Sequence, residues 1–410
     1  MAVSRITRRR FLGATTAVAA GATVVPRHVL GGAGQAAPSE TLAGALIGCG
    51  PRGLGAWRAM GLDSPRLLAV CDVDLRHIER HLKSEQADPR AEGYTDFRRV
   101  LDRQDIDVVC ISTPPHWHAL MCIAAAEAGK DIFCEKPMTK FIAEGRAVAD
   151  AVQRNQVVFQ IGTFGRFGVD RQTHKLYASG LLTDLSGVVV RREVPLRVGR
   201  TDLMPGTPIP DHLDYDMWLG PAPYKPYHPH RVHYSNRFYW DYEGGDLANF
   251  GAHRVDPFQY EYAKDDTGPV AIEPHGAWPQ HPDAVGRWGW VELTYADGLR
   301  FVLETGKWGA PYDRPAGPAP QLSDEDRRKL DALPDPEPLV RFREAIRTRK
   351  QAGGNAEVSH RASTVFHLAN IALRLGRKLQ WDPEQEQFVG DEEANRFVNL
   401  PMRHPWRLES

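Results

Sequence analysis

The stretch Leu42-Ala-Gly-Ala-Leu-Ile47 runs directly into Gly48-Cys49-Gly50-Pro51-Arg52-Gly53, and helical sequence follows to about Leu62. The apolar run predicts a buried strand, and a glycine-rich turn that joins a strand to a helix is typical of dinucleotide-binding domains. The glycines allow a tight turn and let the backbone approach a pyrophosphate at the N-terminus of the helix. This stretch therefore predicts a Rossmann fold for the first part of the folded chain.

Apolar runs and helix-length segments keep alternating after this turn. Further strands are predicted at residues 66–71, 107–111 and 131–134, with helical sequence from about Leu75 and again at about 118–128. Strands that are separated by helices favour a parallel, doubly wound sheet.

A different pattern begins after about Ile161. Apolar runs at residues 187–194, 288–295 and 299–304 predict strands of a large, mostly antiparallel sheet. The segment 313–338 is rich in Pro, Gly, Asp and Arg and is expected to be an exposed loop. We therefore expect an α/β chain divided into a leader of residues 1–37, a dinucleotide-binding domain of residues 38–161 and a second α/β domain of residues 162–410.

Asp72 ends the second predicted strand, 24 residues after Gly48. A carboxylate at this place accepts hydrogen bonds from the adenine-ribose hydroxyls, and its charge repels a 2′-phosphate. We therefore expect NAD as the cofactor. NADP stays open, because the guanidinium of Arg52 within the glycine turn could reach a phosphate.

The N-terminus has the composition of an export signal. It reads Thr7-Arg8-Arg9-Arg10-Phe11-Leu12-Gly13, continues with a mildly apolar run to Val25, and ends in small residues at 31–37. A basic start, a short apolar core and a small-residue cleavage zone describe such a signal, and twin arginines before Phe-Leu resemble the twin-arginine type. We expect residues 1–37 to be removed and the protein to be exported, to the periplasm or otherwise out of the cytoplasm.

The near-zero net charge of the whole chain includes the positive charge of this leader. The chain has 51 Lys and Arg against 52 Asp and Glu, but 46 against 52 once residues 1–37 are removed, which favours solubility. The absence of a basic excess argues against a nucleic-acid partner. No later stretch reaches the roughly 18 apolar residues of a transmembrane helix, so we expect no stable membrane insertion.

Two segments after predicted strands narrow the assignment: Ser112-Thr113-Pro114-Pro115-His116-Trp117-His118 and Glu135-Lys136-Pro137. With the glycine turn they resemble the Gfo/Idh/MocA family of glucose–fructose oxidoreductase and inositol dehydrogenase, whose hallmark is Glu-Lys-Pro. Residues 216–223 and 244–256 resemble parts of the family's second domain. Residues 367–377, with Trp381-Asp-Pro, resemble the subgroup that carries twin-arginine signals.

The resemblance implies a Rossmann domain followed by an α/β domain on an open antiparallel sheet, with the substrate between them. It also implies a homo-oligomer, a dimer or tetramer formed through that sheet. The residues it assigns to cofactor binding are Gly48, Gly50, Pro51, Arg52, Gly53, Asp72, Thr113, Pro114, His118, Glu135 and Lys136.

Hydride transfer from an alcohol needs a base for the hydroxyl proton and a positive group beside the developing alkoxide. Lys136 suits the second role and His253 the first, because a neutral imidazole is poised near working pH. Family members often carry an Asp four residues before the His; here Asn249 stands there, which can hold an imidazole tautomer but cannot stabilise an imidazolium with charge. Asp246 and Asp256 are alternative sources of that charge.

Substrate contacts are expected from the second half, where aromatic faces and polar donors suit a carbohydrate. The candidates are Arg166, Tyr239, Trp240, Asn249 and His253. The histidines at 228, 230 and 233 have no matching carboxylate spacing, so we expect no metal.

The sequence thus predicts an exported NAD(P)-dependent oxidoreductase that acts on a sugar, polyol or glycoside hydroxyl. Because free NAD is scarce outside the cytoplasm, we expect the nucleotide to be tightly held and recycled internally. One alternative is NAD-dependent glycoside cleavage through transient oxidation and elimination, which departs from the two-carboxylate scheme. Another is an inactive protein that only binds sugar or nucleotide.

Overall fold

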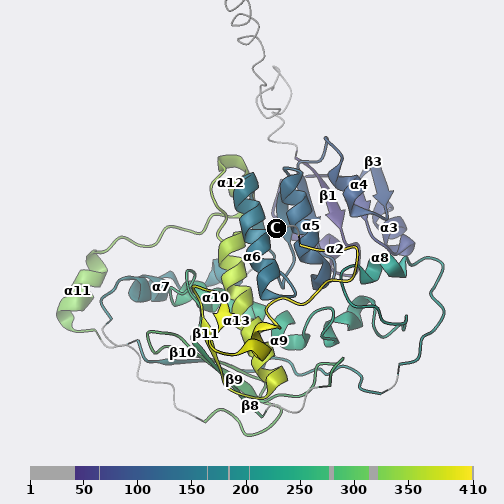
Figure 1. Cartoon of the computed structure of the whole chain (residues 1–410). Helices are drawn as coiled ribbons and strands as arrows, with labels where there is room; N and C mark the ends of the chain where they lie inside the picture. Colours follow the sequence, from purple (N-terminus) through teal and green to yellow (C-terminus); the bar gives the residue numbers. More distant parts are fainter. Residues whose placement is uncertain are drawn as a thin grey trace, which may run out of the picture.

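The computed structural model describes residues 42–408 except 64, 164, 183–184, 203, 277–280 and 314–321, so the predicted leader lies outside the described residues. Two halves follow one another along the chain, and each is built on a six-stranded sheet (Figure 1).

The first sheet confirms the predicted parallel, doubly wound fold. Its order is β3-β2-β1-β4-β5-β6, and all neighbouring strands are parallel. Leu46 packs on one face of the sheet and Ile47 on the other, each in an apolar core, because successive side chains of a strand point to opposite faces. The bounds are Ala43–Ile47 (β1), Arg66–Cys71 (β2), Ala87–Tyr94 (β3), Val108–Ile111 (β4), Asp131–Cys134 (β5) and Phe159–Ile161 (β6).

Helices connect these strands and cover both faces of the sheet. Short N-cap side chains start two of them: Asp74 accepts a hydrogen bond from the backbone N–H of Arg76, and Asp96 from that of Arg98. The helices are Gly53–Ala59 (α2), Leu75–Leu82 (α3), Phe97–Leu101 (α4), His118–Glu127 (α5) and Ile142–Asn155 (α6), with a 3₁₀ turn at Pro115–Trp117.

The second sheet confirms the mostly antiparallel prediction. Its order is β12-β11-β8-β9-β10-β7, and only the β10–β7 pair of described strands is parallel. The strands are Val188–Arg191 (β7), Ala271–His275 (β8), Trp290–Thr294 (β9), Arg300–Glu304 (β10), Leu379–Asp382 (β11) and Gln387–Phe388 (β12).

The helices of the second half are short apart from α13. They are Arg171–Ala178 (α7), Tyr215–Leu219 (α8), Gly245–Asn249 (α9), Ala252–Glu261 (α10), Asp324–Ala332 (α11), Phe342–Thr348 (α12), Ala356–Leu375 (α13) and Glu392–Asn395 (α14), with 3₁₀ turns at Gly165–Gly168 and His233–Phe238. Asn355 caps α13, and Gly376 ends it in the left-handed conformation that favours glycine.

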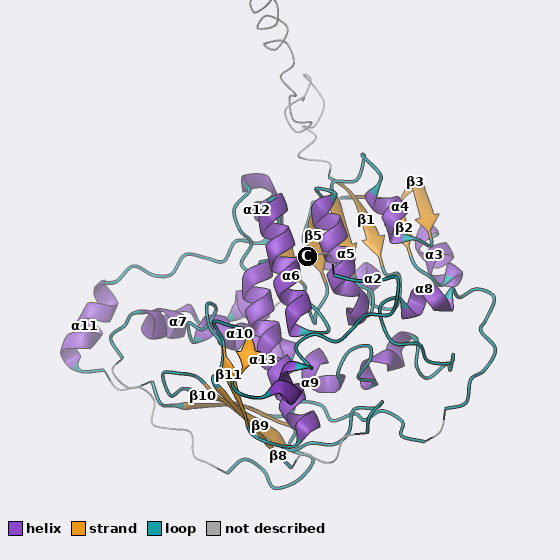
Figure 2. Ribbon diagram, in the orientation of Figure 1, coloured by secondary structure: helices purple, strands orange, loops and turns teal. Residues whose placement is uncertain are grey.

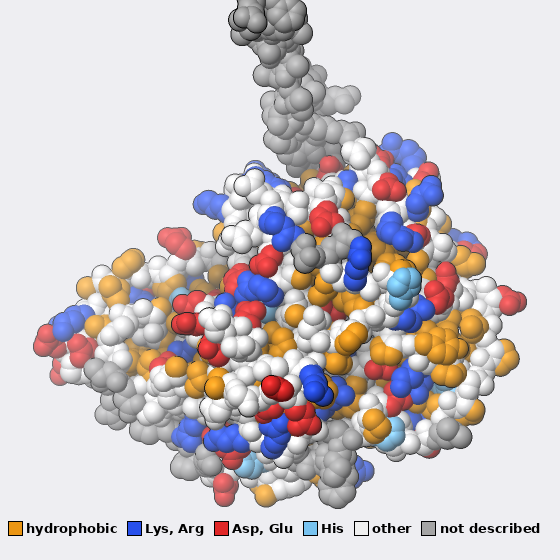
Figure 3. Space-filling view, viewed as in Figure 1, with side chains coloured by type: hydrophobic (Ala, Val, Ile, Leu, Met, Phe, Trp, Pro, Cys, Tyr) orange, Lys and Arg blue, Asp and Glu red, His pale blue; other side chains and the backbone are white. Residues whose placement is uncertain are grey.

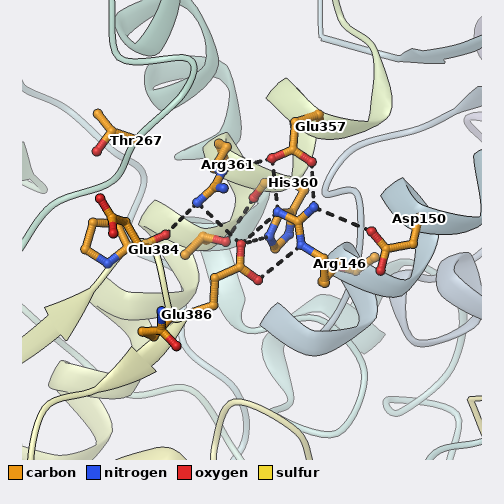
Figure 4. Close-up of polar contacts among 12 residues, drawn as sticks. Arg146, Asp150, Thr267, Glu357, His360, Arg361, Glu384 and Glu386 are labelled. Carbon is orange, nitrogen blue, oxygen red and sulfur yellow. Dashed lines mark hydrogen bonds and ion pairs between the residues drawn. The ribbon is translucent and has the colours of Figure 1, made fainter. Parts of the chain in front are cut away.

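The long helix α13 joins the two halves. It packs against α6 of the first half and against β8 of the second, and Figure 2 shows the two helices side by side between the sheets. Polar contacts reinforce this seam (Figure 4): Arg146 of α6 donates to Glu357 of α13 at 2.7 and 3.0 Å and to Glu386 at 2.8 Å. His360 Nε2 lies 2.8 Å from the same Glu386. Burial alone would raise the pKa of Glu386, but the hydrogen bonds from His360 and Arg146 lower it to about 2.

The sequence does not predict the strands β3, β6, β8, β11 and β12. For β3 the reason is that Ala-Asp-Pro-Arg-Ala-Glu-Gly-Tyr lacks an apolar run; this strand lies at the edge of the sheet and is mostly solvent-facing. The expected loop 313–338 contains the helix α11, which Ser323 caps and which buries none of its own residues. Its polar, helix-favouring sequence forms a helix that projects from the body of the molecule (Figure 1).

The surface and the helices agree with the composition. On the face drawn in Figure 3, acidic and basic side chains are interspersed. Among the described residues, no helix has the length and apolar character needed to cross a membrane.

Candidate active site

Four strands of the first sheet, β1, β2, β4 and β5, end in register with one another at the same edge of the sheet. Ile47 is in register with Cys71 of β2 and with Ile111 of β4, and Ile111 is in register with Cys134 of β5. The loops that follow these strands therefore meet along one edge, which is where open α/β sheets bind ligands.

A cleft of about 650 Å³ opens at this edge, between the two halves. From the first half it is lined by Gly48, Gly50, Pro51, Arg52, Asp72, His77, Thr113, Pro114, Glu135 and Lys136, and from the second by Met217, Trp218, His233, Tyr234, Asn236, Arg237, Glu243, Asn249 and His253. Most of the sequence-predicted cofactor residues and the three predicted catalytic residues thus lie around one cavity.

The glycine turn fits a dinucleotide. Gly48 has φ +92°, and a Cβ there would lie 2.5 Å from the backbone nitrogen of Thr113. At Gly50 no atom of the described residues lies within 4 Å of the Cβ position, so a side chain there would fill the space of the cleft. Gly53 lies outside the lining: its Cβ would stand 2.9 Å from Gly48 O, so this glycine serves the close packing of helix on strand.

Asp72 is held rigidly beside this turn. The backbone N–H of Cys49 donates to Asp72 Oδ2 at 2.7 Å, and that of Asp74 donates to Oδ1 at 2.9 Å. The carboxylate thus has the place expected of a ribose ligand. Arg52, by contrast, donates through Nε to Glu135 at 2.7 Å, so its guanidinium is engaged by a carboxylate. The Glu135 carboxylate therefore competes with a phosphate for this guanidinium, which lines the cleft.

The catalytic candidates form a chain of contacts at the other end of the cleft. Lys136 Nζ donates to the backbone oxygen of Asn249 at 3.0 Å. The Asn249 side chain donates through Nδ2 to Glu243 Oε1 at 2.5 Å. Burial lowers the pKa of the Lys136 ammonium, and the carboxylates of Glu243 and Glu135 act against that shift.

His253 stands in the same part of the cleft as a neutral base. Burial, with a smaller contribution from the charge of Lys136, lowers the pKa of His253 to about 4. The imidazole is therefore uncharged at neutral pH and has a lone pair for a hydroxyl proton.

Glu243 places a carboxylate beside Lys136 and Asn249. Of the two alternatives from the sequence, Asp246 pairs with Arg197. Asp256 pairs with Arg166 and Thr163, but its charge still acts on His253 and opposes the effect of burial on the pKa of that imidazole. The Glu243 side chain is buried, which raises its pKa, while nearby Lys136 and Arg237 act in the opposite direction. Sequence reasoning missed this residue although it directly precedes the motif that begins at Gly244.

Family models match both halves of the chain. Residues 42–163 match the model described as "Oxidoreductase family, NAD-binding Rossmann fold", and residues 171–408 match "Oxidoreductase family, C-terminal alpha/beta domain". The chain belongs to the Gfo/Idh/MocA oxidoreductase family. Its first domain is an NAD-binding Rossmann domain, as the glycine turn and Asp72 predicted.

Curated relatives resemble parts of this oxidoreductase. An alpha-N-acetylgalactosaminidase from Shewanella oneidensis is 34% identical over 173 residues, which are 37% of this chain and 38% of the relative. A levoglucosan dehydrogenase from Pseudarthrobacter phenanthrenivorans is 48% identical over 67 residues, 16% of this chain and 17% of the relative. The matched segments thus span well under half the length of these relatives.

Solved structures share the fold. The WlbA dehydrogenase from Bordetella pertussis, in complex with NADH and UDP-GlcNAcA, has a TM-score of 0.55 at 13% identity and covers 83% of this chain and 99% of its own. The aldose-aldose oxidoreductase from Caulobacter crescentus, complexed with glycerol, has a TM-score of 0.52 at 19% identity, with the same two coverages.

Three predicted substrate residues of this Gfo/Idh/MocA member need correction. Arg166 is 1% exposed and donates to Asp256 and Asp265, so it ties the 3₁₀ turn Gly165–Gly168 to α10 and to the loop that follows this helix. Tyr239 and Trp240 are buried outside the cleft. Tyr239 packs in a buried cluster with Trp218 and Tyr242, and Trp240 Nε1 donates to His281 O at 3.1 Å.

His118 is also corrected, from a cofactor contact to a residue that positions cofactor loops. It is buried, with Nδ1 2.8 Å from Pro137 O and Nε2 2.8 Å from Thr113 O. The ring thereby ties the loop after β4 to the loop after β5.

One group of side chains among the described residues has the spacing of metal ligands. Asp74, His77 and His233 each offer one ligand atom, and these atoms lie within 4.8 Å of one another. The Asp74 carboxylate, however, already accepts from Arg76 Nε at 3.1 Å and from Nη2 at 2.7 Å. Both oxygens are thus engaged by a cation, which disfavours a second cation there.

Proposed function

We propose that this oxidoreductase uses NAD to oxidise a hydroxyl group of a carbohydrate or glycoside. The observation that carries the proposal is the meeting of Lys136, Asn249 and His253 with the glycine turn and Asp72 around one cleft. NAD, when bound by the turn and Asp72, supplies the hydride acceptor.

The chain's own residues would handle the proton and the charge. The neutral His253 takes the proton of the substrate hydroxyl, and the Lys136 ammonium stabilises the negative oxygen that develops. The hydrogen bond from Lys136 to the backbone of Asn249 fixes the direction of the ammonium. Glu243 keeps a negative charge beside it and so favours the protonated form of the lysine.

Replacement of the two residues tests this assignment. Lys136→Ala and His253→Ala should each lower kcat on an identified sugar by roughly 10²- to 10⁴-fold. Lys83→Ala and His228→Ala are matched controls, because both side chains lie outside the cleft. Turnover that survives both cleft substitutions would remove these residues from catalysis.

A second candidate is redox-neutral cleavage of a glycoside, favoured by the relative named alpha-N-acetylgalactosaminidase and by others named glycosyl hydrolase family 109. Oxidation of a ring hydroxyl acidifies the neighbouring C–H, loss of that proton expels the glycosidic oxygen as an alcohol, water adds, and return of the hydride restores the hydroxyl. The net reaction is hydrolysis.

The solvent isotope separates the two reactions. In D₂O the redox-neutral route places deuterium on the carbon next to the oxidised one in the released sugar. Simple oxidation leaves the glycosidic bond intact and accumulates reduced nucleotide. A protein that binds NAD and sugar but gives neither product would be the inactive binding protein.

Export through the twin-arginine pathway is part of the same proposal, and Arg8 and Arg9 before Phe11-Leu12 support it. Arg8→Lys with Arg9→Lys should leave the protein in the cytoplasm in cell fractionation. Continued appearance in the periplasm would contradict the signal.

We also propose that the second sheet mediates a dimer or tetramer; the family resemblance supports this. Light scattering on the purified chain should give a mass of two or four chains. A monomer at micromolar concentration would contradict it.

A further inference from the structure

A segment of the second half crosses the cofactor end of the first half. We call residues 211–237 the strap; it contains α8, which Figure 1 places beside α3. The backbone N–H of Leu75 donates to His212 O at 3.0 Å, and that of Asp214 donates to Val73 O at 2.9 Å. Farther along, Trp117 Nε1 donates to Met217 O at 3.0 Å. The strap is thereby bonded to the loops after both β2 and β4.

The inner side of the strap meets the predicted ribose site. His233, which comes from the strap, lines the cleft together with His77 and Asp72 of the first half. The two imidazole rings lie edge to face at 5.1 Å, and His77 Nδ1 is 3.2 Å from Asp72 Oδ2. His233 Nε2 lies 3.5 Å from Asp74 Oδ2. A side chain of the second domain is thus joined to the carboxylates at the adenosine end.

The outer side of the strap is held by the C-terminal tail. Arg403 donates to Asp216 Oδ1 at 2.6 Å, to Asp216 O at 2.8 Å and to Gly220 O at 2.9 Å. Trp406 packs edge to face on Trp117, with 4.8 Å between ring centroids. Figure 1 shows this tail running back across the first half in front of α5. The strap is therefore enclosed between the cleft and the tail.

We propose that the strap is a clasp which closes the adenosine end of the cleft and that the tail, through Arg403, keeps it shut. The inference rests on the proposed NAD-dependent function and concerns its cofactor. Nucleotide bound between Asp72 and His233 leaves only when the strap lifts. Lifting breaks the bonds to Leu75 and Val73 together with the Arg403 contacts, so a bound nucleotide is retained through many turnovers.

Nucleotide exchange measures the clasp directly. The purified full chain is loaded with NAD, and its replacement by a fluorescent etheno-NAD in excess is followed with time. Arg403→Ala should speed exchange by about tenfold or more, because it removes charge-assisted hydrogen bonds without touching the cleft. Arg377→Ala is the matched control: this arginine also makes a two-bond ion pair, to Asp391, away from the cleft.

Two further variants keep the test decisive. Asp216→Ala removes only an exposed partner of Arg403, so it should speed exchange in a folded protein if Arg403→Ala does not fold. His233→Ala should also speed exchange, whereas His228→Ala in the same strap should not.

Treatment with EDTA should leave the exchange rate unchanged. Faster exchange after EDTA would show that a metal at Asp74, His77 and His233 holds the strap, and this result would overturn the clasp.

The outcomes distinguish failure of the clasp from failure of the proposed function. If the chain binds no NAD at all, the proposed function fails. If it binds NAD and the Arg403, Asp216 and His233 variants all exchange at the wild-type rate, the clasp fails while the proposed function stands.

Discussion

At the scale of single residues, Glu243 places a carboxylate beside Lys136 and Asn249, where the motif has an amide in place of the usual Asp. Glu243 stands six residues before Asn249, accepts a hydrogen bond from its side chain, and acts through its charge on the candidate catalytic residue Lys136. The sequence indicated that a charge was missing. It could not indicate that Glu243 lies at this place, because Glu243 approaches Lys136 only after α9 has folded.

Glu243→Gln should shift the pH profile of the enzyme. Loss of the carboxylate removes the contribution that raises the pKa of Lys136, so the lysine loses its proton at lower pH. We expect the alkaline limb of kcat/KM to move to lower pH and activity near neutral pH to fall by about tenfold. Glu243→Asp, which keeps the charge, should largely restore the limb; an unchanged profile in Glu243→Gln would contradict the role.

Asp72 should decide the choice of nucleotide. Asp72→Asn removes the charge that repels a 2′-phosphate, and we expect the ratio of NADP to NAD affinity to rise about tenfold or more. Arg52→Ala should leave that ratio unchanged, because the guanidinium is bonded to Glu135. Equilibrium titration with both nucleotides measures the ratio, and a large change in the Arg52 variant would reverse the assignment.

At the scale of elements, apolar runs predicted β1, β2, β4 and β5 of the first sheet but missed its edge strand β3 and also β8 inside the second sheet. β1, β4 and β5 are buried on both faces, so their sequences are apolar throughout except for Asp131 at the start of β5. β3 and α11 have little burial, and their sequences therefore carry no hydrophobic pattern. The seam between α6 and α13 rests on contacts across 200 residues of chain, which no local pattern reports.

The polar network in this seam should contribute measurable stability (Figure 4). Arg146→Ala removes hydrogen bonds to both Glu357 and Glu386, and we expect the free energy of unfolding in urea to fall by about 1–2 kcal/mol. Asp150→Ala is the control: its oxygen lies 3.6 Å from Arg146 and its side chain is 47% exposed, so the loss should stay below about 0.5 kcal/mol. Equal losses in the two variants would show that the network adds nothing beyond an exposed ion pair.

At the scale of the whole molecule, the resemblance predicted two domains with a cleft between them, and the structure has both. It did not predict the strap or the tail that covers it, because the strap's contacts run through backbone groups and its sequence is irregular. The prediction of Tyr239 and Trp240 as substrate residues is wrong for a related reason. The sequence shows where aromatic residues cluster along the chain, but it does not show which side of a loop faces the core.

The folded protein should lose stability in acid. Burial lowers the pKa of His116 to about 4 from 6.5, and burial and Lys136 do the same for His253. Between pH 6.5 and 4 the unfolded chain thus binds protons that the folded chain does not, so the free energy of unfolding falls as pH falls, with a slope of up to about 1.4 kcal/mol per pH unit for each histidine. Urea unfolding at stepwise pH checks this, and His116→Gln should flatten the slope; a flat wild-type profile would contradict it.

Single-turnover absorbance of the bound nucleotide tests the central claim most directly. The purified full chain, loaded with NAD and freed of excess, is mixed with a panel of sugars and glycosides. We predict that at least one member produces the absorbance of bound NADH, transient if the hydride returns and lasting if it does not, and that Lys136→Ala abolishes the signal with the nucleotide still bound. No absorbance change with any member, from a chain that holds NAD, would contradict hydride transfer at this site.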